Sequence, residues 1–217
     1  MSEHDFEPVR GLPGDLPVGE RLIWQGAPAW WPLAQRAFHV RSVSAYFAVL
    51  MAWRGGAAAL DGASALASLQ AALHLAPLAI AALALLCGLA ALTARTSVYT
   101  ITSKRVVLRF GVALPKAINI PFKIIDNAAL KGFSDETGDI ALTLSEPNKI
   151  AYFLLWPHAR PWKLARPQPA MRAVPHAAAV AAQLANALNA AHGGGAVVAP
   201  VAAPAPEAAP QAALSPA

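Results

Sequence analysis

The chain has 217 residues, and only 13% of them are charged, against about 25% in a typical soluble domain. Its 17 Lys and Arg residues outnumber the 12 Asp and Glu residues, which gives a net charge of +5. Because these cations are scattered rather than gathered in a block, the positive charge does not point to nucleic acid. A single cysteine, Cys87, excludes an intramolecular disulfide and a cysteine-based metal site.

Residues 1–35 are rich in proline and glycine and are expected to form a cytoplasmic arm. The first seven residues are acidic and lack the apolar run of a secretory signal peptide. Within the arm, residues 19–28 have a short apolar core between turn residues, which predicts one strand that adds to a later sheet. Trp30 and Trp31 follow. Adjacent indoles before a membrane helix are typical of the membrane interface, and core packing of the arm is the alternative.

The strongest membrane signal is the stretch of residues 62–94, which contains no Asp, Glu, Lys or Arg. A helix of about 20 apolar residues crosses the hydrocarbon layer of a bilayer, which is roughly 30 Å thick. The sequence therefore predicts a span at about 73–94. This span is the second half of a transmembrane hairpin that covers residues 38–94.

The first half of the hairpin, at about 41–60, is a weaker signal. Arg41 and Arg54 bracket its uncharged centre at a spacing that is short for a full crossing. A tilted helix fits if the Arg54 side chain reaches the interface, and a re-entrant or interfacial helix is the alternative. Residues 61–72 are interpreted as the connection between the two spans.

The distribution of Lys and Arg predicts the topology of the hairpin. Residues 1–41 carry four of these cations, residues 54–72 carry one, and the chain after residue 94 carries twelve. Cationic flanks are retained on the cytoplasmic side of a membrane. We therefore expect a multi-pass protein of the bacterial cytoplasmic or intracytoplasmic membrane with both termini in the cytoplasm.

After the hairpin, residues 96–191 consist of short apolar segments separated by turn residues, which predicts a small antiparallel barrel or sandwich. A basic, proline-rich segment is predicted at 156–173, a helix at about 175–191, and a disordered Ala/Pro tail at 193–217. The predicted strands are residues 97–102, 106–110, 118–122, 129–133, 140–144 and 150–155.

The sequence carries no motif of a nucleotide site, a metalloprotease or a metal centre, and we do not expect an enzyme. The acidic residues Asp135, Glu136 and Asp139 are interpreted as a polar turn rather than an acid–base site. His39 and His74 lie near the ends of the two spans and are interpreted as interfacial polar contacts, with ligation of a pigment as the alternative.

The segment 156–163 combines two tryptophans, a histidine and two cations with prolines that stiffen the backbone. Stiff aromatic segments lose little conformational entropy on docking, which favours a protein contact, and they also suit lipid headgroups. Packing of the tryptophans on the β domain is the alternative. The predicted partner-binding residues are Trp156, His158, Arg160 and Trp162.

Residues 19–26, 99–106 and 138–140, placed around two spans, resemble the membrane-anchored bacterial pleckstrin-homology (PH) family. This resemblance implies an α+β membrane protein in which a transmembrane helical hairpin precedes a small antiparallel PH-like β-barrel, capped by a C-terminal helix. Residues 5–13 and 155–162 further resemble a family of reaction-centre assembly proteins of purple bacteria.

The second resemblance implies a non-catalytic assembly factor with no cofactor or metal site. Its partners would be the membrane subunits of the photosynthetic reaction centre and of the core light-harvesting antenna, together with the lipid bilayer, and self-association is left open. One alternative is a PH-like module that binds lipid headgroups, for which Lys104, Arg105 and Arg109 are the candidates. Another is a membrane protein that handles pigment.

Overall fold

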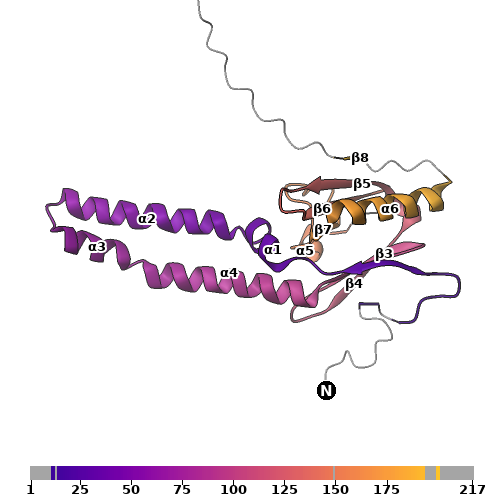
Figure 1. Cartoon of the computed structure of the whole chain (residues 1–217), viewed down its shortest axis with the longest axis horizontal. Helices are drawn as coiled ribbons and strands as arrows, with labels where there is room; N and C mark the ends of the chain where they lie inside the picture. Colours follow the sequence, from indigo (N-terminus) through magenta and orange to yellow (C-terminus); the bar gives the residue numbers. More distant parts are fainter. Residues whose placement is uncertain (1–10, 13, 149, 194–198, 201–217) are drawn as a thin grey trace, which may run out of the picture.

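The computed structural model describes residues 11–12, 14–148, 150–193 and 199–200. Figure 1 shows a long helical hairpin that extends from a domain of two sheets, with the C-terminal helix α6 lying across that domain. The elements are taken below from the hairpin to the sheets, because the site lies where the two meet.

The hairpin consists of α2 (Val40–Leu60) on one arm, with α3 (Ala65–Leu73) and α4 (Ala76–Thr96) on the other. By length and composition, both arms can cross a membrane, with mean hydropathies of 1.3 and 2.5. The interpretation of residues 61–72 as a connection is wrong for most of its length. Ser64 caps α3 by accepting a hydrogen bond from the Ala67 amide at 3.3 Å, and the Ala, Leu and Gln residues that follow favour helix.

The N-terminal arm contributes the predicted strand and also a helix, which the sequence analysis missed. The strand β1 (Leu22–Gly26) pairs antiparallel with β2 (Val98–Thr102), which confirms the predicted strand. The helix α1 (Trp30–Arg36) begins at the paired tryptophans. Pro32 does not break it, because a proline in the first turn of a helix costs no intrahelical hydrogen bond.

The sheet domain contains two four-stranded sheets, with orders β1-β2-β3-β4 and β7-β6-β5-β8. Neighbouring strands are antiparallel, apart from the short parallel pair of β5 and β8. A 3-10 turn, η1 (Phe122–Ile124), connects the two sheets. The remaining strands are β3 (Arg105–Phe110), β4 (Lys116–Pro121), β5 (Ile125–Gly132), β6 (Gly138–Leu144), β7 (Ala170–Val174) and β8 (Ala199–Pro200).

The main apolar core lies between the two sheets and helix α6 (Ala177–His192). Val180, Leu184 and Leu188 of α6 are buried, as their helical spacing predicts. Gly138 at the start of β6 lets the helix approach closely, since an added Cβ would lie 2.6 Å from the Ala177 Cβ. The sheets contribute Tyr99, Ile101, Leu108, Ile120, Ile140, Leu142 and Met171 to the same core.

Two further predictions need correction. The predicted strand at 150–155 is the short helix α5 (Tyr152–Leu155), because a short apolar run does not distinguish a strand from a helix. The segment 156–173 also contains most of strand β7, which was not predicted. All five residues of this strand are buried, including Arg172. Most of the predicted disordered tail, residues 194–198 and 201–217, lies outside the described residues.

Candidate functional site

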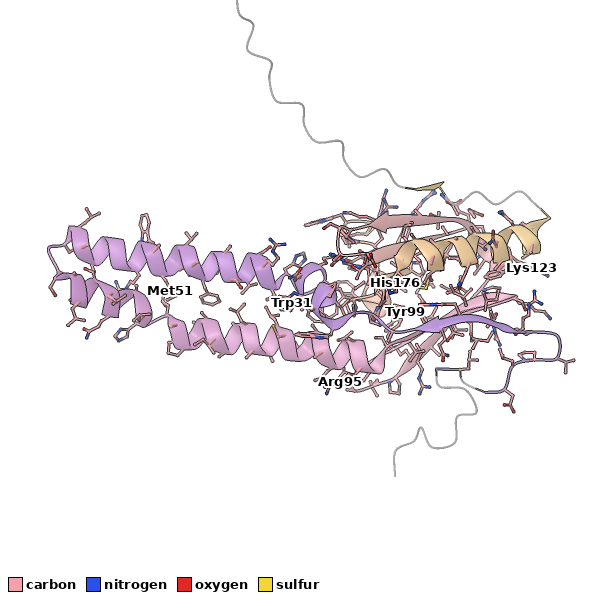
Figure 2. The ribbon with its side chains drawn as sticks, in the orientation of Figure 1. Trp31, Met51, Arg95, Tyr99, Lys123 and His176 are labelled. Atoms are coloured by element: carbon pink, nitrogen blue, oxygen red, sulfur yellow. The ribbon has the colours of Figure 1, made fainter. Side chains whose placement is uncertain are left out.

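Segments that are far apart in the sequence meet at the base of the hairpin, where Figure 2 places Trp31, Arg95 and Tyr99. Strand β2 begins at Val98, two residues after α4 ends at Thr96. A second buried apolar cluster holds α1 and both arms of the hairpin against β7. Its members are Leu33, Ala34, Phe38, Val40, Ala90, Ala94 and Ala173.

His158 is fully buried beside the start of β2 and makes two hydrogen bonds. Its Nδ1 lies 2.7 Å from the Tyr99 hydroxyl, and its Nε2 lies 3.1 Å from the Ser97 hydroxyl. Because the Tyr99 oxygen also accepts from the Arg172 amide at 3.1 Å, its proton is best placed to donate to Nδ1. The neutral imidazole then donates from Nε2 to Ser97, so all three side chains are satisfied.

Arg172 extends this buried network into strand β7. Its Nε lies 2.9 Å from Oδ2 of Asp139, a contact that is an ion pair rather than an aligned hydrogen bond. A guanidinium N–H donates to the Ala159 carbonyl at 3.1 Å. The other Asp139 oxygen accepts from the Ala173 amide at 2.8 Å. Arg172 on β7 and Asp139 on β6 therefore join the segment around His158 to two neighbouring strands of the second sheet.

His158 and Tyr99 are held neutral within this network. Burial, followed by the positive charge of Arg172, lowers the pKa of His158 to about 3. Burial also raises the pKa of Tyr99 well above its ordinary value, although the Arg172 amide and charge oppose this effect. Desolvation penalises the charged form of both groups. At neutral pH, His158 and Tyr99 therefore hold neighbouring segments together and do not act as an acid–base pair.

The four predicted partner-binding residues do not form one surface. His158 is in the interior, and Arg160 pairs with Gln168 through its backbone amide at 2.9 Å and its side chain at 3.1 Å. Trp156 is half exposed and packs edge-on against Phe38, with 5.5 Å between ring centroids. Trp162 lies six residues further along the same segment and is 92% exposed. His158 and Arg160 thus anchor a segment from which the two tryptophans project.

Exposed apolar side chains surround the base of the hairpin, and we call this set the collar. On one side α1 and α5 contribute to it, and α5 carries Phe153, which is 92% exposed. The turn after β3 contributes on another side, because Arg109 near the end of β3 pairs with Val98 directly after α4. The collar consists of Trp30, Trp31, Val112, Leu114, Phe153, Leu154 and Trp156.

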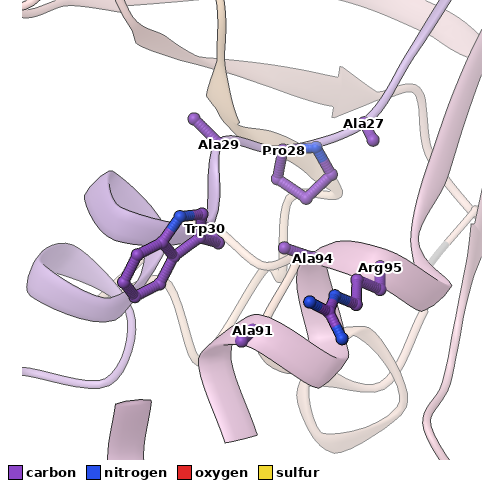
Figure 3. A pocket seen from close by; sticks show the side chains of 7 residues that line it. All are labelled: Ala27, Pro28, Ala29, Trp30, Ala91, Ala94 and Arg95. Carbon is purple, nitrogen blue, oxygen red and sulfur yellow. The ribbon is translucent and has the colours of Figure 1, made fainter. Parts of the chain in front are cut away.

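A pocket of about 610 Å³ lies within the collar, between the last turns of α4 and the connection from β1 to α1. Figure 3 shows the Trp30 indole on one side of it and Arg95 on the other, with Ala91 and Ala94 on the helix between them. Ala27, Pro28 and Ala29 complete the lining. Most of the side chains that line the pocket are small and apolar, and Arg95 is the only charged residue among them.

Arg36 at the end of α1 fastens the hairpin to the sheet domain. Its guanidinium lies 2.6 Å from Asp135 and 2.6 Å from the Thr137 hydroxyl, and it stacks 3.5 Å from the centre of the Phe133 ring. The hydrogen bonds from Arg36 and then Thr137 lower the pKa of Asp135 to about 2. Sequence reasoning missed this contact, since about one hundred residues separate its partners and only the fold brings them together.

The other predicted candidates are spread over the molecule. Arg105 pairs with Glu20 at 2.9 Å at one end of β3, whereas Arg109 lies at the opposite end of the strand, so these cations do not line one headgroup site. His39 precedes α2 at the base of the hairpin, whereas His74 lies between α3 and α4 on the other arm. Within the described residues, no group of three or more His, Cys, Asp or Glu side chains could hold a metal ion.

The fold and the sequence together define the class of protein. The bacterial PH domain family matches residues 47–188, which include most of the hairpin and strands β2 to β7, and the chain belongs to this family. It is also similar to a 23.7 kDa protein of Rhodobacter capsulatus that is described as uncharacterized and lies in the puhA 5′ region. The two are 41% identical over 177 residues, which are 75% of this chain and 77% of the relative. No solved structure matches the chain.

Proposed function

We propose that this protein is a non-catalytic assembly factor for the photosynthetic reaction centre and its core light-harvesting complex. The proposal follows the resemblance of residues 5–13 and 155–162 to the purple-bacterial assembly protein PuhB. The 41% identity to a purple-bacterial protein whose gene lies in the puhA 5′ region supports it. In this role the protein binds membrane subunits before they join the finished complex.

The proposed location is the cytoplasmic or intracytoplasmic membrane, with the hairpin across the bilayer and the sheet domain on the cytoplasmic side. The two long apolar arms and their exposed side chains support this placement. The excess of Lys and Arg outside the hairpin supports the orientation, because cationic flanks stay in the cytoplasm. The collar would then lie at the level of the lipid headgroups, where Trp side chains are favoured.

The observation that carries the partner-binding proposal is the exposure of large apolar groups beside the hairpin. Fully burying a Phe side chain is worth about 1.5–3 kcal/mol, so a 92% exposed Phe153 favours a surface that a partner or lipid covers. Exposed apolar side chains of α2 and α4, such as Tyr46 and Leu92, follow the collar along the hairpin, which suits a transmembrane helix that leaves the bilayer beside it. Trp162 is the proposed second contact.

The test is affinity purification of the tagged full-length protein from mild-detergent membranes of a photosynthetically growing culture. Mass spectrometry of the eluate should show reaction-centre or antenna subunits enriched over an unrelated membrane bait. Phe153→Ser should reduce this enrichment most and Trp162→Ser less, while Val18→Ser, an exposed apolar site before β1, should preserve it. Absence of these subunits from the wild-type eluate would contradict the proposal.

A headgroup-binding or pigment-handling protein is the second candidate function, and the same eluate tests it. An absorption spectrum of the sample reveals bound pigment, and His74→Ala tests ligation by the histidine between α3 and α4. In the structure Nδ1 of His74 lies 2.9 Å from the Gln70 carbonyl of its own helix, so a ligand that keeps this contact would bind through Nε2.

A further inference from the structure

We propose that the outer edge of strand β5 is a docking site for an extended, apolar segment of a protein partner, which adds to the second sheet as a parallel strand. In the free protein β8 (Ala199–Pro200) covers part of this edge, and the partner segment replaces it. The inference does not rest on the assembly role, and the edge lies outside the collar and the hairpin. Four observations carry it: the direction of the backbone groups, the shortness of β8, the sequence of β5, and a pocket beside the strand.

Alternate residues of β5 direct their backbone N–H and C=O groups away from β6. Ala128 pairs with Leu142 of β6, and the Leu142 amide donates to the Pro169 carbonyl on the opposite side at 2.8 Å. In an antiparallel ladder, two opposite residues either exchange their hydrogen bonds or both point away from each other. The backbone groups of Ala128 therefore point to the outer edge. Those of Leu130 and Gly132 do the same, because the pattern repeats every two residues.

Strand β8 shows how this edge accepts a segment, although it covers only a short part of it (Figure 1). Its two residues pair parallel with Ala129 and Leu130, whereas β6 pairs along the whole of β5. In a parallel pair, Ala199 opposite Ala129 bonds to the residues on either side of Ala129. Pro200 then points away from β5, so its missing N–H costs no ladder bond. Strands usually have about 5–6 residues, so a longer segment gains further bonds and can replace β8.

The sequence of β5 leaves its outer edge open to pairing, whereas the other sheet edges in the described part of the chain are protected. Natural edges are protected by prolines, charges, bulges or covering segments. A bulge interrupts β1 after Leu22, and all of β7 is buried. Strand β4 begins with Lys116 and ends with Pro121. The bulge and the charges of β5 lie outside residues 128–130, which are Ala-Ala-Leu, and such an edge suits strand addition.

A pocket of about 300 Å³ lies at the end of this edge, between β5 and the first turn of α6. Gly132 lines it and has open space where a Cβ would be. Because side chains alternate along a strand, the residue two places after the one opposite Leu130 lies beside Gly132 and faces the pocket. The site therefore accommodates one apolar side chain at that position. The lining consists of Leu130, Gly132, Phe133, Glu136, Thr137, His176, Ala177, Ala178 and Ala179.

Fluorescence anisotropy with a labelled peptide of residues 196–204, Ala-Val-Val-Ala-Pro-Val-Ala-Ala-Pro, tests the site. This probe contains the β8 residues and is titrated with the full-length protein in mild non-ionic detergent. In the Ala199→Pro variant neither residue of β8 has an N–H, so the edge should be freed. If β8 covers the edge in about nine-tenths of the molecules, the variant should bind about tenfold more tightly than the wild-type protein. Failure of the variant to bind the peptide, or equal affinities of the two proteins, would overturn the inference.

Two N-methylated peptides distinguish strand addition from general apolar adhesion. Methylation at Ala199 and Val201 removes the N–H groups that an added strand directs to β5, and it should abolish binding. Methylation at Val198 and Ala202 removes as many N–H groups from the other side of the strand and should leave binding unchanged. Equal binding of the two methylated peptides would refute strand addition.

Two leucine-substituted peptides test the register. Leucine in place of Ala202 should tighten binding about tenfold, because its side chain enters the pocket beside Gly132. Leucine in place of Ala203 is the matched control, since that side chain faces the other side of the sheet. Equal gains from the two peptides would contradict the docking geometry.

Hydrogen–deuterium exchange of the Ala199→Pro variant locates the bound peptide. Exchange should slow in residues 128–132 and stay unchanged in β4, and the reverse pattern would overturn the site. Light scattering of the wild-type protein tests a second copy as the occupant. A dimer that Ala199→Pro converts into a monomer would show that another copy of this chain supplies the strand, and it would overturn docking of a different partner.

Discussion

The helical hairpin exposes most of its apolar side chains, whereas the sheet domain buries its own in a core. In the most apolar part of α2 no residue is buried. In the most apolar part of α3 and α4 only 11% of the residues are buried. The sheet domain instead encloses a core shared by both sheets and α6. The sheet domain therefore buries its apolar side chains internally, whereas the hairpin leaves most of its own exposed.

Polar groups follow the same division. The sheet domain buries a connected set of Ser97, Tyr99, His158 and Arg172 and joins it to the partly buried Asp139, and each member has a partner. A buried polar network of this kind specifies one arrangement of the chain, because breaking any link leaves a group without water or partner. The comparison predicts that substitutions in this network are costly, whereas exposed ion pairs and the hairpin surface tolerate change.

The largest expected effect comes from Arg172→Ala. It leaves the Asp139 carboxylate uncompensated in a largely buried site, and breaking a buried ion pair costs about 3–5 kcal/mol. Guanidinium chloride unfolding of the full chain in detergent, followed by tryptophan fluorescence, measures the change in the free energy of unfolding.

The control for this substitution is Arg166→Ala, which breaks an ion pair with Glu146 whose side chains are 75% and 66% exposed. Exposed pairs contribute about 0–1 kcal/mol, so this variant should unfold almost like the wild-type protein. Equal losses in the two variants would refute the division between buried and exposed charges drawn above.

The next effect concerns the packing of α6 on the second sheet. Gly138→Ala places a Cβ 2.6 Å from the Ala177 Cβ and 3.0 Å from the Lys131 carbonyl oxygen, so helix and strand must separate. Overpacking of this kind costs about 1–3 kcal/mol. Gly132 is the cross-strand partner of Gly138 and has open space at its Cβ, so Gly132→Ala is the matched control. The same unfolding experiment should separate the two alanine variants clearly.

Acid should weaken the sheet domain through His158. An unfolded histidine titrates near pH 6.5, whereas the folded-state pKa of His158 is about 3. Between these values the unfolded chain binds a proton that the folded chain does not, so stability falls as the pH is lowered. The slope is at most about 1.4 kcal/mol per pH unit, or about 2 kcal/mol from pH 6.5 to pH 5.

His158→Gln provides the comparison for this pH dependence. Its amide can accept from Tyr99 and donate to Ser97, but it does not titrate. Unfolding free energies measured from pH 7.5 to pH 5 should decline less steeply in the variant than in the wild-type protein. Asp135 does not interfere, because its contribution changes only between its ordinary pKa of 3.8 and its folded-state pKa of about 2, below the measured range. Parallel slopes would show that His158 is not the group responsible.

The sequence predicts those parts of the fold whose signals are local. The uncharged stretch 62–94 predicts the second arm of the hairpin, and the apolar core of residues 19–28 predicts β1. The helical spacing of Val180, Leu184 and Leu188 predicts the buried face of α6. In each case neighbouring residues alone determine the pattern.

The parts that the sequence does not predict depend on distant partners. Strand β7 carries Arg172 in its middle, and this charge is buried only because Asp139 lies opposite it. From the sequence, His158 is predicted to be an exposed member of an aromatic segment, because its contacts with Ser97 and Tyr99 are formed only in the fold. The pocket beside Arg95 forms only when residues 27–30 of the N-terminal arm pack beside the end of α4. Local composition carries no information about such pairings.

The smallest expected effect tests the hairpin itself. Gly55 and Gly56 are adjacent in α2, but only Gly55 faces α3, where an added Cβ would lie 3.2 Å from both the Ala72 Cβ and the Ser68 carbonyl oxygen. Gly56 meets nothing within 4 Å. Leucine at either position improves helix propensity by about 0.8 kcal/mol, and at position 55 the steric cost outweighs this gain.

Gly55→Leu should therefore destabilise the hairpin by about 1 kcal/mol, and Gly56→Leu should leave it unchanged or slightly more stable. Unfolding by sodium dodecyl sulfate in mixed micelles, followed by circular dichroism, reports on the helices rather than on the sheets. Equal behaviour of the two variants would mean that α2 and α3 do not depend on close contact. The hairpin would then be held together by its surroundings alone, and its contrast with the sheet domain would be greater than the structure indicates.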